Sequence, residues 1–345
     1  MKGLFICRRG GEEILRAELQ RTLPRSHHEV TGPGLVTAAI APEDDGIRPI
    51  LAFSSQLLMN PQQVKLPSIT AWARALTETL GDKLGNEDEP WRLHVYPLSR
   101  GYEPTNERRA VLIEQEVVRI LKARHRAILS RRLDDASPLT PAGLVQLALA
   151  DAETGFLSIL TAEQARQFEH ALSPFPAGFV AVPIDKRPPS TAYRKLLEAQ
   201  LRFGCRIGEA KRCVELGAAP GGWTHVLLDQ GAVVTAIDRV PLRQDLMVHP
   251  RLTFRSADAF EFVPAQPVDW LLSDVIAAPE RSIELIRSWV AEGWCRAFLV
   301  TVKFKGRGAY GLLEELKEWL RHHTRRFLLR QLVVNKNEVT VIGEL

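Results

Sequence analysis

The feature that most constrains the fold is a glycine-rich segment, Glu215-Leu216-Gly217-Ala218-Ala219-Pro220-Gly221-Gly222-Trp223-Thr224. The apolar residues Cys213 and Val214 precede it, and a helical pattern, His225 to Leu228, follows it. This order predicts a strand, a tight turn and a helix. Glycines let the backbone approach a ligand closely, and the free amides at a helix start hold polar groups. The segment has neither the G-x-G-x-x-G spacing of a dinucleotide site nor the Gly-Lys-Ser/Thr of a P-loop.

Strand-like and helix-like segments alternate through the C-terminal half. The expected strands are 212–217, 232–238, 252–256, 268–274, 297–304, 327–334 and 338–344, and the expected helices are 223–228, 280–292 and 310–323. Crossover-length segments separate the first five strands, which implies parallel pairing. The short turn 335–337 joins the last two strands, so the final strand should run antiparallel to its neighbour. We therefore expect an α/β domain with a seven-stranded sheet and a ligand beyond the carboxyl ends of its parallel strands.

With 345 residues the chain is longer than one ordinary domain. Prolines concentrate between residues 174 and 189, which predicts an extended connector. We therefore expect an N-terminal domain at 1–173, a linker at 174–188 and the α/β domain at 189–345. The N-terminal part mixes helix and strand patterns and reads as α+β. Its expected helices are 11–23 and 107–130, and its expected strands are 4–7, 35–40 and a hairpin of 144–150 with 155–160.

Positive charge is concentrated in two groups, although the formal net charge is only +4. Residues 91–132 hold ten Lys/Arg, Arg100 among them, and four Asp/Glu, a local charge of +6. The second group is Arg321, His322, His323, Arg325 and Arg326. Such groups suit a polyanion, because each phosphate contact releases counterions. A solvated helix face would give the same pattern.

Several classes of protein are disfavoured by what the sequence lacks. Near the N-terminus only residues 4–7 are apolar before Arg8 and Arg9, which is too short for the core of a signal peptide. No apolar stretch reaches the ~18 residues of a membrane helix. The four cysteines are scattered without CxxC spacing, which argues against a zinc site or a disulfide framework. We expect a cytoplasmic protein without a membrane segment or a bound metal.

The glycine-rich segment resembles the first S-adenosylmethionine motif of the FtsJ-like RNA ribose methyltransferases. The resemblance implies a class I (Rossmann-like) methyltransferase fold with S-adenosylmethionine as cofactor. The expected cofactor contacts in this segment are Glu215, Gly217, Ala218, Pro220, Gly221, Gly222 and Trp223. Asp238, at the end of the second strand, would bind the ribose hydroxyl pair, and Asp258 would bind the adenine amino group. For each aspartate the alternative is a helix N-cap or a turn residue.

Four polar residues match the catalytic tetrad of that family: Lys195, Asp274, Lys303 and Glu338. Lys195 opens the helix before the sheet, Asp274 and Lys303 end strands, and Glu338 opens the last strand. Doubly wound topology should bring them to one edge of the sheet. Taken singly, each has a structural alternative, such as a solvated helix lysine for Lys195 or a loop cap for Asp274.

The chemistry explains why such a set is needed. A ribose hydroxyl must lose its proton as it attacks a sulfonium methyl group, and a partly desolvated lysine near another cation can accept that proton. We expect Lys303 to be the base, with Asp274 and Lys195 steering the hydroxyl. Glu338 would hold Lys195 or the ribose, and Asp274 would also contact the cofactor.

Missing motifs narrow the reaction further. Amino-group methylases typically carry Asn/Asp-Pro-Pro-Tyr/Phe after the fourth strand, where this chain has Asp274-Val275-Ile276-Ala277-Ala278-Pro279. A cytosine-C5 enzyme needs a nucleophilic cysteine beside that loop, and none of the four cysteines is there. Oxygen methylation remains.

The whole chain resembles the RlmM-type family of bacterial enzymes, which methylate a cytidine ribose 2′-oxygen in large-subunit (23S) ribosomal RNA. The matching pieces are Cys7-Arg8-Arg9-Gly10-Gly11-Glu12, Phe53-Ser54-Ser55, the glycine-rich segment, Gly293-Trp294-Cys295-Arg296 and Glu338-Val339-Thr340-Val341. The resemblance implies an N-terminal THUMP domain with a ferredoxin-like piece that holds RNA, either 23S rRNA or its precursor particle. The stretch after Asp274 and the loop 303–308 depart from the family pattern. The alternatives are another RNA such as tRNA, a non-catalytic RNA-binding ribosome-assembly factor, and a small-molecule O-methyltransferase.

Overall fold

The computed structural model describes residues 1–345 except 45, 86–87, 99–107, 135–139 and 307. The chain divides into two compact units, Met1–Phe179 and Val180–Leu345, and the division falls inside the expected linker. Arg100 lies outside the described residues, as do residue 107 at the start of the expected helix 107–130 and residue 307 in the loop 303–308. Among the described helices, none is both long and apolar enough to cross a bilayer.

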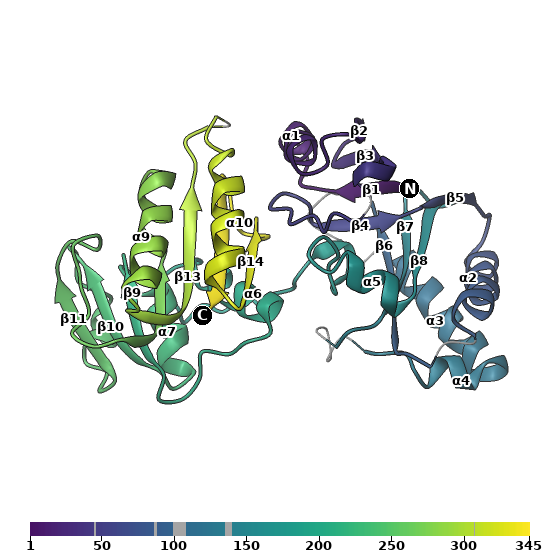
Figure 1. The fold of residues 1–345 in the computed structure, drawn as a ribbon. Coiled ribbons are helices and arrows are strands. Elements are labelled where there is room, and N and C mark those ends of the chain that lie inside the picture. Colours follow the sequence, from purple (N-terminus) through teal and green to yellow (C-terminus); the bar gives the residue numbers. More distant parts are fainter. Residues whose placement is uncertain (45, 86–87, 99–107, 135–139, 307) are drawn as a thin grey trace. The chain divides into compact units, whose positions relative to one another are not determined.

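The first unit, coloured purple to teal in Figure 1, begins with a four-stranded antiparallel sheet in the order β2-β3-β1-β4. Its elements are β1 (Lys2–Ile6), α1 (Glu12–Thr22), β2 (His27–Gly32), β3 (Leu35–Ala39), the 3-10 turn η1 (Pro42–Asp44) and β4 (Gln56–Met59). Helix α1 buries Leu15 and Leu19 and contacts β2 and β3. This strand order is that of a ferredoxin-like sheet, with η1 and a loop where a second helix would stand. The expected ferredoxin-like piece is therefore present.

The same unit contains a second sheet in the order β5-β8-β7-β6. The strands are β5 (Gln62–Lys65), β6 (Trp91–Pro97), β7 (Gly143–Leu149) and β8 (Thr154–Leu160), and the helices are α2 (Ile69–Leu84), α3 (Arg108–Arg124), α4 (Arg126–Leu129), α5 (Ala162–Gln167) and the 3-10 turn η2 (Pro176–Gly178). The β7–β8 hairpin was expected and is confirmed. Strand β6 pairs parallel with β7.

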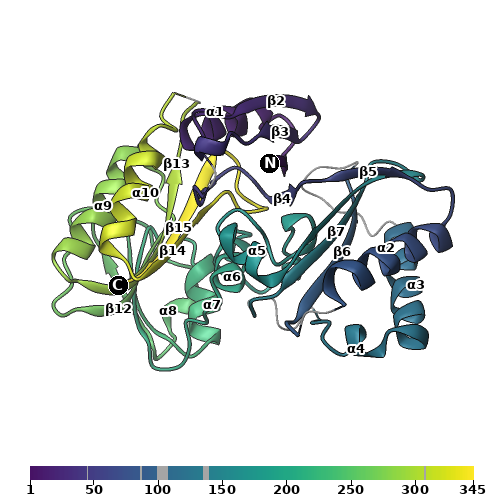
Figure 2. The same cartoon turned by 45° about the vertical axis from the view of Figure 1, so that its right-hand side comes forward.

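Helices α2 and α3 pack against each other and share one core with the second sheet (Figure 2). The core is built from residues with almost no exposed surface, such as Trp72, Leu76, Ile113 and Val145. On α2 the residues Trp72, Leu76 and Leu80 recur every four positions, which is the period of one helix face.

The prediction of one continuous helix over 107–130 was wrong. His125 has φ −138° and ψ 55°, and it separates α3 from the short helix α4. The break lets Ile128 turn into the core, where its carbonyl accepts a hydrogen bond of 2.8 Å from the indole nitrogen of the buried Trp91.

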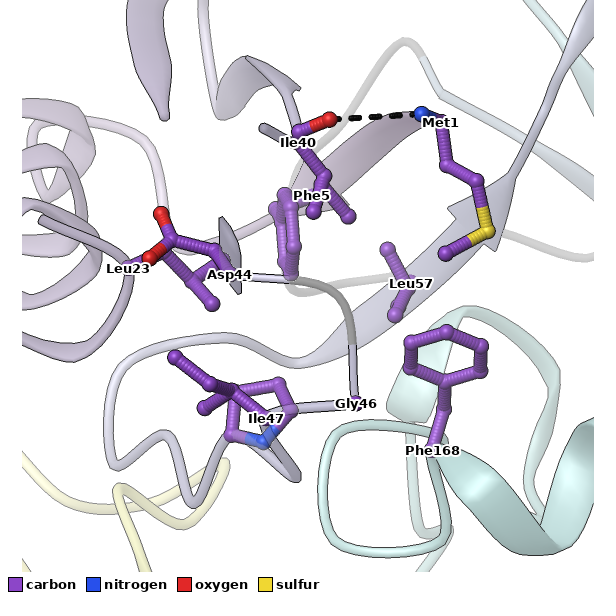
Figure 3. A pocket seen from close by; sticks show the side chains of 10 residues that line it. Met1, Phe5, Leu23, Ile40, Asp44, Gly46, Ile47, Leu57 and Phe168 are labelled. Atoms are coloured by element: carbon purple, nitrogen blue, oxygen red, sulfur yellow. Dashed lines mark hydrogen bonds between the residues drawn. The ribbon is translucent and has the colours of Figure 1, made fainter. Parts of the chain in front are cut away.

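A hollow in the first unit is lined mainly by apolar side chains, among them Phe5, Leu57 and Phe168 (Figure 3). Its volume of about 10 Å³ is close to the space of a single water molecule. The carboxylate of Asp44 at its edge already accepts hydrogen bonds from the Ser26 hydroxyl and the Arg25 amide. No predicted site residue lines this hollow.

The second unit is an α/β domain with one seven-stranded sheet, in the order β11-β10-β9-β12-β13-β15-β14. The strands are β9 (Arg212–Leu216), β10 (Val233–Asp238), β11 (Leu252–Ser256), β12 (Val268–Ser273), β13 (Cys295–Lys303), β14 (Arg326–Arg330) and β15 (Glu338–Glu344), and the helices are α6 (Tyr193–Phe203), α7 (Gly222–Asp229), α8 (Gln244–Met247), α9 (Pro279–Ala291) and α10 (Leu312–His323). The first five strands run parallel, and β15 is antiparallel to both β13 and β14. The predicted fold class is confirmed.

The strand order reverses between β9 and β12, because the chain continues outward to β10 on one side and to β13 on the other. Right-handed crossovers in opposite directions place the connecting helices on opposite faces. Helix α6 accordingly contacts α7, and α9 contacts α10. Helices α9 and α10 can be seen side by side in Figure 2. The carboxyl ends of β9 and β12 therefore border the crevice where open α/β sheets bind ligands.

Candidate functional site

The turn after β9 has a backbone that favours glycine. Gly217 has φ +73° and Gly221 has φ +105°, both in the left-handed region. A Cβ on Gly217 would lie 2.5 Å from the side chain of Val275, and one on Gly222 would lie 2.3 Å from the hydroxyl of Ser190. The turn is thus packed closely between the loop after β12 and the segment before α6.

Backbone hydrogen bonds hold this turn to the end of β10. The Gly217 amide donates to the Ile237 carbonyl over 2.9 Å, and the Ala219 amide donates to Asp238 over 2.9 Å. The Ala219–Pro220 peptide is cis. Gly221 caps α7 without a side-chain hydrogen bond. The first amides of α7 are therefore not capped by a side chain at this position and suit a polar ligand group.

Two residues of the glycine-rich segment are engaged in internal contacts. The indole nitrogen of Trp223 donates to the Ala192 carbonyl over 2.8 Å, which ties α7 to the start of α6. The carboxyl of Glu215 is buried and accepts a hydrogen bond of 2.5 Å from the Thr224 hydroxyl. Burial raises the pKa of Glu215 to about 8. At neutral pH this group is mostly a neutral acid, so it can donate as well as accept a hydrogen bond.

The two predicted cofactor aspartates also have partners. Asp238 accepts from the amides of Ala219 and Val240, at 2.9 and 3.0 Å, and so helps to shape the glycine turn. Asp258 accepts from the Phe260 amide and pairs with the guanidinium of Arg239 at 2.6 Å. These two hydrogen bonds hold the pKa of Asp258 below its usual value. Asp258 thus has the contacts of a turn aspartate, which was the alternative interpretation from the sequence. That it binds the adenine amino group stays a proposal.

The four tetrad residues lie together, although 143 positions separate the first from the last. The ammonium of Lys195 lies 3.1 Å from both carboxylate oxygens of Asp274 and 2.6 Å from Glu338. Lys303 lies 3.0 Å from Oδ1 of Asp274 and donates to the Asp274 backbone carbonyl over 2.7 Å. The strand register places Lys303 directly opposite Glu338. Asp274 is therefore the centre of the cluster.

The cluster is largely buried but remains open to a ligand. The exposed fractions of the side chains are 12% for Lys195, 17% for Asp274, 20% for Lys303 and 10% for Glu338. Two ammonium groups and two carboxylates balance each other in number. Lys303 is the most exposed of the four, and it is also the lysine with the fewer carboxylate partners.

Part of the second unit matches a known protein family. Residues 189–318 match the family described as FtsJ-like methyltransferase. The second unit carries an FtsJ-like methyltransferase domain. This match confirms the predicted methyltransferase domain and its cofactor, S-adenosylmethionine.

Several curated relatives of this chain are named ribosomal RNA large subunit methyltransferase M. The one from Pseudomonas fluorescens is 36% identical over 178 residues, which are 48% of this chain and 50% of its own. The one from Xanthomonas oryzae pv. oryzae is 32% identical over 180 residues, 50% of this chain and 52% of its own. The chain thus spans about half the length of the curated relatives it matches. A solved structure of TrmN from Thermus thermophilus has 16% identity and a TM-score of only 0.33, at 100% coverage of both chains.

The loop after Lys303 is anchored at its base. The Phe304 amide donates to the Asn337 carbonyl over 2.9 Å, and the Asn337 side chain donates to the Phe304 carbonyl over 2.6 Å. The Tyr310 hydroxyl also bonds to Asn337. Asn337, which sequence reasoning treated only as a turn residue, therefore fixes the strand end that carries Lys303 to the one that carries Glu338.

The second basic group of the sequence, at residues 321–326, is largely compensated within the domain. Arg321 pairs with Glu318 at 2.7 Å, and Arg325 and Arg326 pair with Glu344 at 2.6 and 2.8 Å. These cations are less available to a polyanion than the sequence suggested.

Proposed function

We propose that this chain transfers the methyl group of S-adenosylmethionine to the 2′-oxygen of a ribose, on a cytidine of large-subunit ribosomal RNA. The observation that carries the proposal is the Lys195–Asp274–Lys303–Glu338 cluster beside the glycine turn of an FtsJ-like domain. The names of the curated relatives support the RNA substrate. The cytidine rests on the sequence resemblance alone, and the cytoplasmic location rests on the scattered cysteines.

The residues around the turn fit the cofactor. Gly217 and Gly221 keep the backbone free of side chains, the start of α7 has no side-chain cap, and Asp238 and Asp258 stand at the ends of the next two strands. When bound there, S-adenosylmethionine supplies a sulfonium methyl group as the electrophile. A positively charged group placed near Glu215 would favour the carboxylate form of this buried acid.

The contacts of the two lysines suggest different roles. Lys195 lies against two carboxylates, Asp274 and Glu338, and these hold it as an ammonium that positions the ribose. Lys303 has one carboxylate partner and a backbone carbonyl, so it is the better candidate for releasing and accepting a proton. The ribose oxygen would take the methyl group, and the sulfur of the cofactor would keep the electron pair of the broken carbon–sulfur bond. Lys303 would first release its own proton, and its neutral Nζ would then accept the proton of the ribose hydroxyl. Such proton transfer contributes about 10²–10⁴-fold.

The first unit would hold the RNA through exposed cations at the junction of α3 and α4. Lys122, Arg124, His125 and Arg126 are exposed, and within the described part of the chain they form no ion pair with a carboxylate. Uncompensated cations suit phosphates, because each contact releases counterions. By contrast, Arg132 is paired with Glu114, and Arg131 donates to the Leu84 carbonyl.

The experiment is transfer of radiolabelled methyl from S-adenosylmethionine to total RNA from a strain that lacks this gene. Label in large-subunit rRNA, surviving as an alkali-resistant dinucleotide, is the expected result. Lys303→Ala should abolish transfer, whereas Lys305→Ala, the matched control two residues away in an exposed loop, should keep it. Label only in tRNA would overturn the substrate. No label in any RNA, with cofactor binding intact, would favour an assembly factor or a non-RNA acceptor.

A further inference from the structure

One buried hydroxyl contacts the centre of the tetrad and was not expected from the sequence. Thr301 lies on β13 two residues before Lys303, and alternation along a strand puts both side chains on the same face. Its Oγ1 lies 2.5 Å from Oδ1 of Asp274 and 3.1 Å from the backbone carbonyl of Ser273. Thr301 is 1% exposed, so its hydroxyl is available to neither solvent nor substrate.

A threonine hydroxyl has one proton to donate, and here the nearer acceptor is the charged one. A separation of 2.5 Å is in the range of a charge-assisted O–H···O⁻ bond. Oδ1 of Asp274 therefore accepts a hydrogen bond from the Thr301 hydroxyl and also lies close to the ammonium groups of Lys303 and Lys195. Oδ2 accepts a hydrogen bond from Lys195 alone among these three, at 3.1 Å. The terminal torsion of an aspartate is broad, so a fixed donor on one oxygen determines how the carboxylate faces both lysines.

We propose that Thr301 is a positioning residue of the methyl-transfer site, which acts through Asp274; this inference rests on the proposed function. The hydroxyl takes up part of the acceptor capacity of Oδ1 and holds the carboxylate in place. Without it, Asp274 is free to turn toward Lys303 and to pair with it more strongly. A more strongly paired Lys303 keeps its proton to higher pH and is a poorer base at neutral pH.

The test compares four variants with wild type in the methyl-transfer assay. Thr301→Val keeps the shape and removes the hydroxyl, and it should lower kcat about tenfold, the loss of one hydrogen bond to a charged group. The KM for RNA should not change, and the acidic limb of the pH–rate profile should move to higher pH. Thr301→Ser restores the hydroxyl and should recover both kcat and the profile. Thr301→Ala is the second deletion if the valine variant does not fold.

Thr340→Val is the matched control. Thr340 is 2% exposed, lies opposite Thr301 in the strand register, and its hydroxyl accepts from Asn335 rather than from a tetrad side chain. The Thr340→Val variant should have the same pH–rate profile as wild type. An unchanged kcat and profile in Thr301→Val, a serine variant as impaired as the valine variant, or an equal shift in Thr340→Val would each overturn the inference. If wild type transfers no methyl group at all, the proposed function fails instead.

Discussion

Glu215 is the last residue but one of β9 and Asp274 directly follows the adjacent strand β12, and each accepts a hydrogen bond from a threonine hydroxyl at 2.5 Å. Their surroundings differ in charge. Asp274 lies within 3.1 Å of two lysine ammonium groups. Among the described residues, no cation contributes to the pKa shift of Glu215, and burial raises the pKa of this carboxyl group to about 8. Two acids on one sheet edge thus have different chemistry: Asp274 organises cations, and Glu215 is a buried neutral acid at pH 7. The neighbours, rather than the residue type, determine which role a carboxyl group takes.

The largest effect is expected from Asp274→Asn, which removes the charge that both lysines share. Methyl transfer should fall at least about 100-fold, because both the orientation and the proton transfer depend on that carboxylate. The measurement is kcat at saturating RNA and cofactor. Asp245→Asn, whose aspartate is exposed and pairs only locally with Arg243, is the control and should retain wild-type kcat. An active Asp274→Asn enzyme would mean that the two acids do not differ in the way described.

Removal of the hydroxyl beside the neutral acid should affect stability. Thr224→Val leaves the buried carboxyl of Glu215 without its side-chain partner, and this should cost about 1–3 kcal/mol of unfolding free energy. Urea unfolding measures the change. In the double variant with Glu215→Leu, where both polar groups are replaced, the further cost of Thr224→Val should largely disappear. Equal costs in both backgrounds would exclude coupling between these residues.

Glu215→Gln should change how stability depends on pH. Since the pKa of Glu215 rises from its ordinary 4.5 to about 8 on folding, the folded state holds a proton that the unfolded state has released. Its contribution is fully present below pH 4.5 and is lost as the pH rises toward 8. The difference in unfolding free energy, wild type minus Glu215→Gln, should therefore decrease steadily from pH 5 to about pH 8. A constant difference would show that Glu215 is ionised at neutral pH.

The two basic groups also differ in their neighbours, because carboxylates pair with the group at 321–326 but not with the cations at the α3–α4 junction in the described residues. We expect a smaller effect of this difference, on RNA binding. Replacing Arg124 by Ala should weaken RNA binding a few-fold and reduce the slope of log affinity against log salt by about one, if it contacts a phosphate. Arg325→Ala, whose arginine already pairs with Glu344, should leave that slope unchanged. Salt titration of RNA binding measures both. Equal slopes in both variants would contradict the assignment of the α3–α4 junction as the RNA contact.

The sequence predicted the sheet and the grouping of four polar residues at one of its edges, because the signals for both are local. Apolar runs mark β9 to β13, and each tetrad residue stands at a recognisable end of a strand or helix. The role of Thr301 was not predicted because its partner, Asp274, lies 27 positions away, directly after β12. Only the register of β12 with β13 brings the two side chains together. The break at His125 accompanies a hydrogen bond between Ile128 and Trp91, which lie 37 positions apart, so no local pattern contains it. Helix α2 was missed although Trp72, Leu76 and Leu80 carried a clear four-residue period.

The place of β15 in the sheet has a consequence for the order of assembly during synthesis. Residues 338–344 are made after β14, yet they lie between β13 and β14, and β15 is the one neighbour of β14 among the strands that the structure describes. On the ribosome, β14 must wait for the strand that follows it before it joins the sheet, and Glu338 reaches Lys195 only in that same step. A nascent chain that ends before residue 338 contains the glycine turn and both lysines but lacks the carboxylate that completes the cluster. Completion of the four-residue cluster and closure of the sheet are thus one event, reached only after β15 has left the exit tunnel.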